Sequence, residues 1–153
     1  MIDRRHALLA AGAALLIAMP ARAAERAVLK IKVYKDPSCG CCTAWAERLT
    51  AAGFSVDVEA HDDMAALKAE LGVPDDLASC HTGLIGRYTI EGHVPPADIK
   101  RLIAKHGPGT GLAVPGMPIN SPGMEVPGEA NERYTVWLFN KDGTRSAYSQ
   151  HGG

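Results

Sequence analysis

The sequence predicts an α/β domain in which helices pack against one sheet. Segments with the two-residue alternation of strands are interleaved with segments whose apolar residues recur at helical spacing, and Gly or Pro ends most of them. The 153 residues fit a single domain, and 46% hydrophobic with 22% charged residues is typical of a folded protein. The 16 basic and 17 acidic side chains nearly balance, which argues against a nucleic-acid-binding protein.

Residues 1–23 are predicted to be a cleavable export signal and not a part of the fold. Arg4 and Arg5 precede an uncharged apolar run, 7–19, which is too short to cross a bilayer as a permanent helix. Residues 21–23 then supply the A-x-A pattern of a cleavage site, although an uncut membrane anchor is the alternative. The arginine pair resembles a twin-arginine signal, and the general secretory route stays open. We therefore expect a periplasmic protein with no membrane segment after cleavage.

The expected elements between residues 24 and 107 follow the order strand, helix, strand, helix, two strands and helix. Alternation over 29–34 and 54–58 predicts the first two strands, and Trp45 and Leu49 lie one turn apart on the helix between them. The other expectations are a first helix over 42–52, a second helix capped by Asp62 with the stripe Met64, Leu67 and Leu71, a hairpin of 84–85 and 88–90, and a helix from Pro96 that buries Ile99, Leu102 and Ile103.

This order is typical of a thioredoxin-like domain, in which the first two strands are parallel and joined by a right-handed crossover. Residues 108–153 are expected to form a C-terminal extension. The segment up to Glu132 is dense in Gly and Pro, carries two methionines and shows no periodicity. The remainder predicts a β-hairpin of strands 133–139 and 144–148.

Three of the four cysteines, Cys39, Cys41 and Cys42, crowd the point where the first strand passes into the first helix. Free backbone N–H groups and the helix dipole stabilise thiolates at such a turn. Thiolates serve both disulfide exchange and soft-metal binding, so the location alone leaves both open. Cys39 and Cys42 have the C-x-x-C spacing of a redox pair, whereas Cys41 is a surplus thiol that favours a metal site.

The fourth cysteine, Cys80, falls with His81 on the loop that enters the third strand and should approach the cysteine turn. Thioredoxin-like domains usually carry a cis-proline there, but Pro74 is the nearest upstream proline and lies too far away. A thiol or imidazole in its place favours metal binding. Thiolates with thioether and imidazole suit Cu(I) first and Zn(II) second. One or two ordinary disulfides are the alternative in an oxidising compartment.

Methionine and histidine supply further candidate ligands. Met117 and Met124 both lie in Pro-Gly-Met segments of irregular chain, where no helix face requires them, so we expect ligands or walls of the site. His93 is expected to be either a ligand or an exposed residue. The other assignments are Met64 to the core, His61 and His106 to the surface, and none for His151.

These motifs resemble the CopG-type copper-resistance proteins, a domain-of-unknown-function family of exported metal-binding proteins. The matching segments are 34–42 with Trp45, 72–74, 79–82, 90–95, 111–118 and 121–125. The resemblance implies a thioredoxin-like fold with a C-terminal extension, a periplasmic location, and copper bound by Cys39, Cys41, Cys42 and Cys80. It also implies that the Met-bearing extension helps to close the site. Asn120 departs from the family, which commonly has Gly in this loop. The departure bears on the conformation of the loop and not on the ligands.

We therefore expect a periplasmic copper-binding protein of copper tolerance, with periplasmic efflux components as partners. Its thiolates would hold copper and would also serve interconversion of Cu(I) and Cu(II). The alternative is a thiol-disulfide oxidoreductase with Cys39 as nucleophile and Cys42 as resolving thiol. An enzymatic role would accordingly be that of a copper or thiol oxidoreductase. A third hypothesis, a purely structural exported domain, predicts neither metal nor activity.

Overall fold

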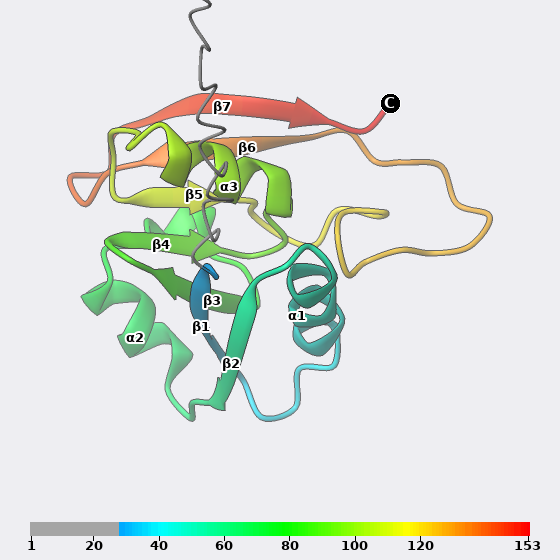
Figure 1. Ribbon diagram of the computed structural model, residues 1–153, viewed down its shortest axis with the longest axis horizontal. Helices are drawn as coiled ribbons and strands as arrows, with labels where there is room; N and C mark the ends of the chain where they lie inside the picture. The colour runs from blue at the N-terminus through cyan, green and yellow to red at the C-terminus, as the bar shows by residue number, and fades with distance from the viewer. Residues whose placement is uncertain (1–27) are drawn as a thin grey trace, which may run out of the picture.

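Seven strands form one continuous sheet in the computed structural model, which describes residues 28–153. The predicted export signal lies outside these residues. Along the sheet the strand order is β2-β1-β3-β4-β5-β6-β7 (Figure 1). The strands are β1 (Lys30–Lys35), β2 (Ser55–Ala60), β3 (His81–Ile85), β4 (Tyr88–Glu91), β5 (Gly111–Ala113), β6 (Tyr134–Phe139) and β7 (Arg145–His151). The fold is therefore mixed α/β, as predicted.

Three helices and a short 3-10 helix cover the two faces of this sheet. They are α1 (Cys41–Ala51), α2 (Met64–Glu70), the 3-10 helix Asp75–Leu77, and α3 (Pro96–Ala104). α1 and α3 bury their apolar faces in one core cluster, whereas the 3-10 helix contributes to a second cluster with the last strands. Within the described residues, no helix is both long enough and apolar enough to span a bilayer.

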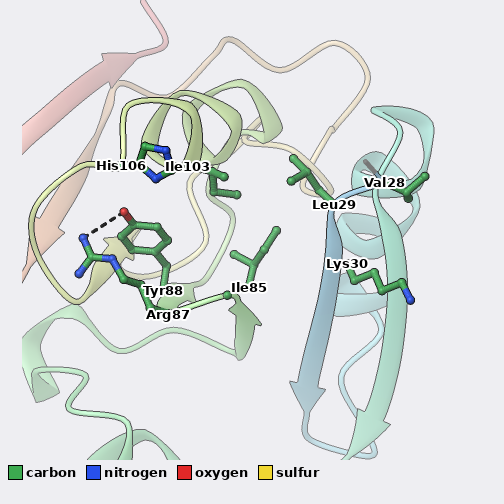
Figure 2. Close-up of a pocket in the computed structure, with 9 residues that line it drawn as sticks. Val28, Leu29, Lys30, Ile85, Arg87, Tyr88, Ile103 and His106 are labelled. Atoms are coloured by element: carbon green, nitrogen blue, oxygen red, sulfur yellow. Dashed lines mark hydrogen bonds between the residues drawn. The ribbon is translucent and has the colours of Figure 1, made fainter. Parts of the chain in front are cut away.

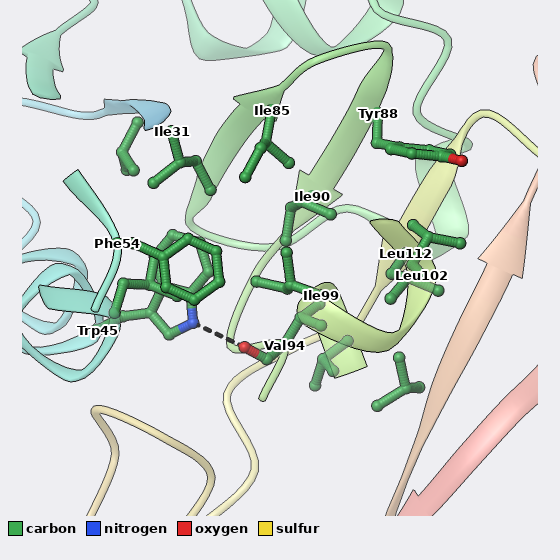
Figure 3. Close-up of a cluster of buried hydrophobic side chains, with 14 residues drawn as sticks. Ile31, Trp45, Phe54, Ile85, Tyr88, Ile90, Val94, Ile99, Leu102 and Leu112 are labelled. Atoms are coloured by element: carbon green, nitrogen blue, oxygen red, sulfur yellow. Dashed lines mark hydrogen bonds between the residues drawn. The ribbon is translucent and has the colours of Figure 1, made fainter. Parts of the chain in front are cut away.

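The larger core lies between α1, α3 and the central strands. Trp45 and Leu49 of α1 are completely buried, as are Ile99 and Leu102 of α3, which confirms the helical spacing read from the sequence. Figure 3 shows Trp45, Ile99 and Leu102 in one cluster with side chains of the sheet. The indole N–H of Trp45 donates to the carbonyl of Val94, 3.0 Å away, so this polar atom is satisfied inside the core.

The strand pairing brings the C-terminal end of β1 and the N-terminal end of β3 to the same end of the sheet. β1 pairs with β2 in parallel and with β3 antiparallel, in a register that sets Lys35 opposite His81. The chain leaves β1 toward Cys39 and enters β3 directly after Cys80. The antiparallel register therefore places both cysteine segments at one end of the sheet.

Strand β5 was not predicted, because three residues are too few to show alternation. It pairs in parallel with β4 and antiparallel with β6, so the strands of the extension continue the sheet of the preceding residues. Gly111 is required for this pairing, since a Cβ there would lie 1.8 Å from the carbonyl oxygen of Thr89. Close backbone approach, and not hydrophobic pattern, builds this strand.

Helix α2 differs from the prediction in its cap and in its buried residue. Asp63, and not Asp62, is the N-cap, and its carboxylate accepts from the backbone N–H of Ala66 at 2.9 Å. Met64, predicted to be core, is only half-buried, and the buried side chain of α2 is Lys68. The cause is a buried carboxylate opposite the helix, which attracts the ammonium group inward.

Candidate metal centre

The cysteine turn is built by the passage from β1 into α1. Cys41 and Cys42 are the first two residues of the helix, and Gly40 at the N-cap offers no side-chain cap. The first turn of the helix, which carries these two cysteines, therefore receives no side-chain cap for its backbone N–H groups. The ammonium of Lys35 donates to the carbonyl of Cys39 at 3.0 Å and so holds the turn against the end of β1.

The four cysteine sulfurs lie within 4.8 Å of one another, which confirms the predicted approach of Cys80 to the turn. Cys39 and Cys42 form a disulfide, and Cys41 and Cys80 are free thiols. The sulfur of Cys41 lies 3.3 Å from that of Cys39 and 3.7 Å from that of Cys80. In this state two of the four predicted thiolate ligands are joined to each other, and Cys41 links the disulfide to Cys80.

Two imidazoles complete the inner side of the site. His81 Nδ1 lies 3.2 Å and His93 Nε2 lies 3.4 Å from the Cys80 sulfur, and both rings are completely buried. The sequence left open whether His93 is a ligand or an exposed residue. Its burial excludes the exposed position. Its Nδ1–H donates to the carbonyl of Pro122 at 2.9 Å, and this leaves Nε2 with a lone pair toward the sulfur.

His81 is held by packing as well as by its contact with the thiol. Its ring lies 4.3 Å from the ring of Trp45, centroid to centroid, and 4.9 Å from that of His93. Its Nε2 is the one buried side-chain nitrogen or oxygen among the described residues with no hydrogen-bond partner. A buried polar atom without a partner is costly, and such atoms concentrate where function requires them.

Burial sets the protonation of this site. It raises the pKa of the Cys80 thiol to about 12, and the nearby Cys41 sulfur adds to the effect. Burial also lowers the pKa of His81 to about 3, with His93 contributing, and lowers the pKa of His93. Both imidazoles are therefore neutral at pH 7, the form that binds metals. A cation next to Cys80 would compensate the thiolate that burial disfavours.

The two predicted methionines have different places. Met117 Sδ lies 3.9 Å from Cys41 Sγ and its side chain is 51% exposed, so a thioether stands at the outer mouth of the site. Met124 is half-buried in a tight turn, where its backbone binds Asn120 and Ser121. Among the described residues, the structure thus brings the thioether of Met117, and not that of Met124, into contact with a cysteine sulfur.

Residues 114–132 form the loop that carries Met117 over the site. Asn120 has φ +62°, a left-handed conformation that Asn tolerates better than most residues. Its side chain accepts from the N–H of Val126 and donates to the carbonyl of Glu129. Asn120 therefore adopts a backbone conformation that Gly adopts readily, and its side chain also closes the loop.

Gly123 fastens the same loop to α1, a feature that the sequence reading missed. Its φ is +87°, and a Cβ there would lie 2.6 Å from the backbone nitrogen of Trp45. The carboxylate of Glu125 adds an ion pair of 2.8 Å with Arg48 on α1. The loop therefore lies directly on the helix whose first turn carries the cysteines.

Other features lie away from the sulfurs. His151 binds the carboxylate of Asp98 at 2.7 Å and so joins β7 to α3. His106 is exposed, as expected, whereas His61 is half-buried beside Tyr34. A pocket of about 540 Å³ opens at the opposite end of β1, β3 and β4 (Figure 2); it is lined by Val28, Leu29, Lys30, Ile85, Gly86, Arg87, Tyr88, Ile103 and His106.

Known proteins match this chain over the site and over most of the fold. A family model described as "Protein of unknown function, DUF411" matches residues 77–124. Two solved structures, named "Copper resistance protein copG- Form 1" and "Form 2", are each 44% identical to it. They cover 82% and 81% of this chain, which in turn covers 99% and 98% of theirs, with TM-scores of 0.77 and 0.76.

The chain belongs to the CopG copper-resistance protein family. This membership, and the DUF411 model with it, agrees with the resemblance found in the sequence motifs. The family-model match includes Cys80, His81, His93 and Met117, and the structural matches extend the likeness to most of the chain. No curated protein matches the sequence.

Proposed function

We propose that this protein binds copper in the periplasm at the cysteine turn, as part of copper tolerance. The observation that carries the proposal is the convergence of four cysteine sulfurs with one thioether and two neutral imidazoles. Thiolate, thioether and imidazole are the donors that copper prefers over harder cations. Membership of a copper-resistance family supports copper over zinc as the cargo. Copper efflux components of the periplasm are the expected recipients.

The Cys39–Cys42 disulfide determines how many thiolates the site can offer. In the disulfide form the free donors are Cys41 and Cys80, with the two imidazoles and Met117 around them. Reduction adds two thiolates next to Cys41. We therefore expect the reduced protein to hold more Cu(I) than the disulfide form.

The same pair supplies a route between the two oxidation states of copper. Two Cu(II) ions each take up one electron, the thiolates of Cys39 and Cys42 are oxidised, and their sulfurs join in a disulfide. Two Cu(I) ions are the other product, so charge and electrons balance. A dithiol or another two-electron reductant then restores the thiolates.

The fold and location of this protein enter the proposal as well. The strand order β2-β1-β3-β4, with α1 directly after β1, supports a thioredoxin-like assignment for the described part of the predicted domain 24–107. Residues 1–23 have the sequence features of an export signal. Periplasmic delivery would place the site where a disulfide can persist.

A thiol-disulfide oxidoreductase is the second candidate, and the cysteine pair itself favours it. Cys39 is half-exposed and Cys42 is completely buried, an arrangement that suits an attacking thiol and a protected resolving thiol. Cys41 and Cys80 have no role in that chemistry, and this sets the two candidates apart.

Cys41→Ser distinguishes the two functions, because it removes the thiol that touches both the disulfide and Cys80. Copper bound per chain, measured by metal analysis after loading with Cu(I), should fall by half or more. Disulfide reduction through Cys39 and Cys42, measured with insulin as substrate, should be unchanged. Ser38→Ala on the same turn is the matched control and should keep its copper. Full copper binding by Cys41→Ser would contradict the proposal.

A further inference from the structure

Behind the metal centre lies a buried carboxylate that neither the sequence nor the proposed copper chemistry accounts for. Glu91, at the end of β4, is completely buried. Its Oε1 accepts from the ammonium of Lys68 at 2.5 Å and from the backbone N–H of Ser79 at 2.6 Å. Its Oε2 accepts from the hydroxyl of Thr82 at 2.7 Å. Lys68 also donates to that hydroxyl at 2.8 Å, so the network is closed.

A buried ion pair is a weak source of stability, since both charges lose their hydration. A pair of apolar side chains would fill the same space without that loss. Burial raises the pKa of Glu91, whereas the ammonium of Lys68 opposes this change. A buried and fully hydrogen-bonded pair does, however, hold its partners in one geometry. The partner that matters here is Ser79, the residue before Cys80.

Ser79 is fastened on two sides. Its N–H binds the Glu91 carboxylate, and its hydroxyl donates to the carbonyl of Gly116 at 2.6 Å, directly before Met117. A Cβ at Gly92 would lie 2.7 Å from the Ser79 side chain, so the residue directly after β4 also approaches Ser79 closely. One residue thus connects the buried ion pair to both the Cys80 thiol and the loop that carries the thioether.

We propose that Glu91 is a positioning residue for the Cys80 thiol, which it acts on through the backbone N–H of Ser79. The inference rests on the proposed copper site for its spectroscopic readout. Two sulfurs that bind the same ion, each with a metal–sulfur bond of about 2.3 Å as for zinc, can be no more than about 4.6 Å apart. The sulfurs of Cys41 and Cys80 are 3.7 Å apart. A displacement of the Cys80 sulfur by about 1 Å directly away from Cys41 would therefore prevent both sulfurs from binding the same ion.

Two charge-balanced double variants isolate the hydrogen bond to Ser79. Glu91→Leu with Lys68→Met removes the acceptor and leaves no unpaired charge. Glu91→Gln with Lys68→Met is equally neutral, but its amide oxygen still accepts from Ser79 and its NH2 group can donate to Thr82. Both are loaded with Cu(I) after reduction, and the thiolate-to-copper absorption per chain is recorded. Melting temperatures show that each variant is folded.

The leucine variant should lose the part of the thiolate-to-copper absorption that Cys80 contributes, and the glutamine variant should keep it. Iodoacetamide labelling of the metal-free, reduced proteins, followed by peptide mass spectrometry, should show Cys80 reacting several-fold faster in the leucine variant only. Equal absorption and equal Cys80 labelling in two folded variants would overturn the proposal. If the unmodified protein binds no copper, the copper function fails, and the labelling rates still decide the role of Glu91.

Two further variants guard against a purely structural effect. Asp98 is a second buried carboxylate, with an ion pair to Arg101 and a hydrogen bond to His151, and Asp98→Asn should lower the melting temperature without changing absorption or labelling. If the leucine variant does not fold, Thr82→Val removes one anchor of Glu91 and leaves Lys68 in place. It should give a partial loss of absorption with faster Cys80 labelling. Unchanged values in folded Thr82→Val would equally overturn the proposal.

Discussion

At the scale of single residues, the chemistry of this protein depends on which atoms burial leaves protonated. Cys80 lies between the cysteine turn and two buried imidazoles, and its raised pKa means that it carries its proton in the metal-free protein at pH 7. His81 and His93 have lowered pKa values and carry no charge. A metal that binds Cys80 must therefore displace a proton from sulfur.

Copper binding at neutral pH should release a proton from Cys80, because its pKa of about 12 lies far above the solution pH. A lower pH supplies the competing proton, so the affinity for copper falls as the pH falls. Neither imidazole offsets this trend, since both are already neutral. Calorimetric titration with Cu(I) in buffers of different ionisation enthalpy measures the protons released.

Cys80→Ser is the control for that measurement. The serine variant should release fewer protons per copper than the unmodified protein, and its affinity should depend less on pH. An identical proton count in the two proteins would show that Cys80 is not a ligand.

At the scale of elements, the loop 114–132 brings a thioether to the turn between β1 and α1. The sequence already indicated a ligand-bearing segment, since Met117 and Met124 occur where no helix or strand requires them. Only the folded conformation of the loop determines which of the two methionines reaches the cysteine turn. Gly123 is tight against α1, Asn120 closes the loop, and Met117 is the methionine that reaches Cys41.

Gly123→Ala should displace this loop and weaken copper binding, because its Cβ would meet the backbone of Trp45. The comparison is Gly128→Ala, whose φ of +88° nearly equals the +87° of Gly123 but whose Cβ would meet nothing within 4 Å. Each substitution strains the backbone by about 1 to 3 kcal/mol. Copper affinity, measured by competition with a Cu(I) chelator, should fall in Gly123→Ala alone. Equal affinities would argue that the loop takes no part in the site.

At the scale of the whole molecule, one sheet joins the cysteine-bearing strands to the C-terminal ones. The link is β5, which lies between β4 and β6 and is the shortest strand of the described chain. Its neighbour β4 ends in Glu91, so the central sheet also positions the buried carboxylate behind the site. The stability of the last strands and the geometry of the centre are therefore connected through β4.

Gly111→Ala should destabilise the protein strongly, because its Cβ would lie 1.8 Å from the carbonyl oxygen of Thr89 and would separate β5 from β4. We expect a loss of about 3 kcal/mol or more in the free energy of unfolding, measured in urea. Gly86→Ala, at a turn with open space around it, should cost about 1 kcal/mol through its positive φ. A loss for Gly111→Ala no larger than this would mean that the β4–β5 pairing is dispensable.

The sequence by itself determined the local elements and the concentration of sulfur. Periodicity identified α1 through Trp45 and Leu49, and the spacing of Cys39 and Cys42 marked the turn, because backbone preferences and helix faces depend on residues close along the chain. The tertiary structure alone decided which of the distant groups meet. It buried His93, joined Lys68 to Glu91 and formed β5. Each of these depends on which strands become neighbours and on the burial that follows, because the groups concerned lie far apart along the chain.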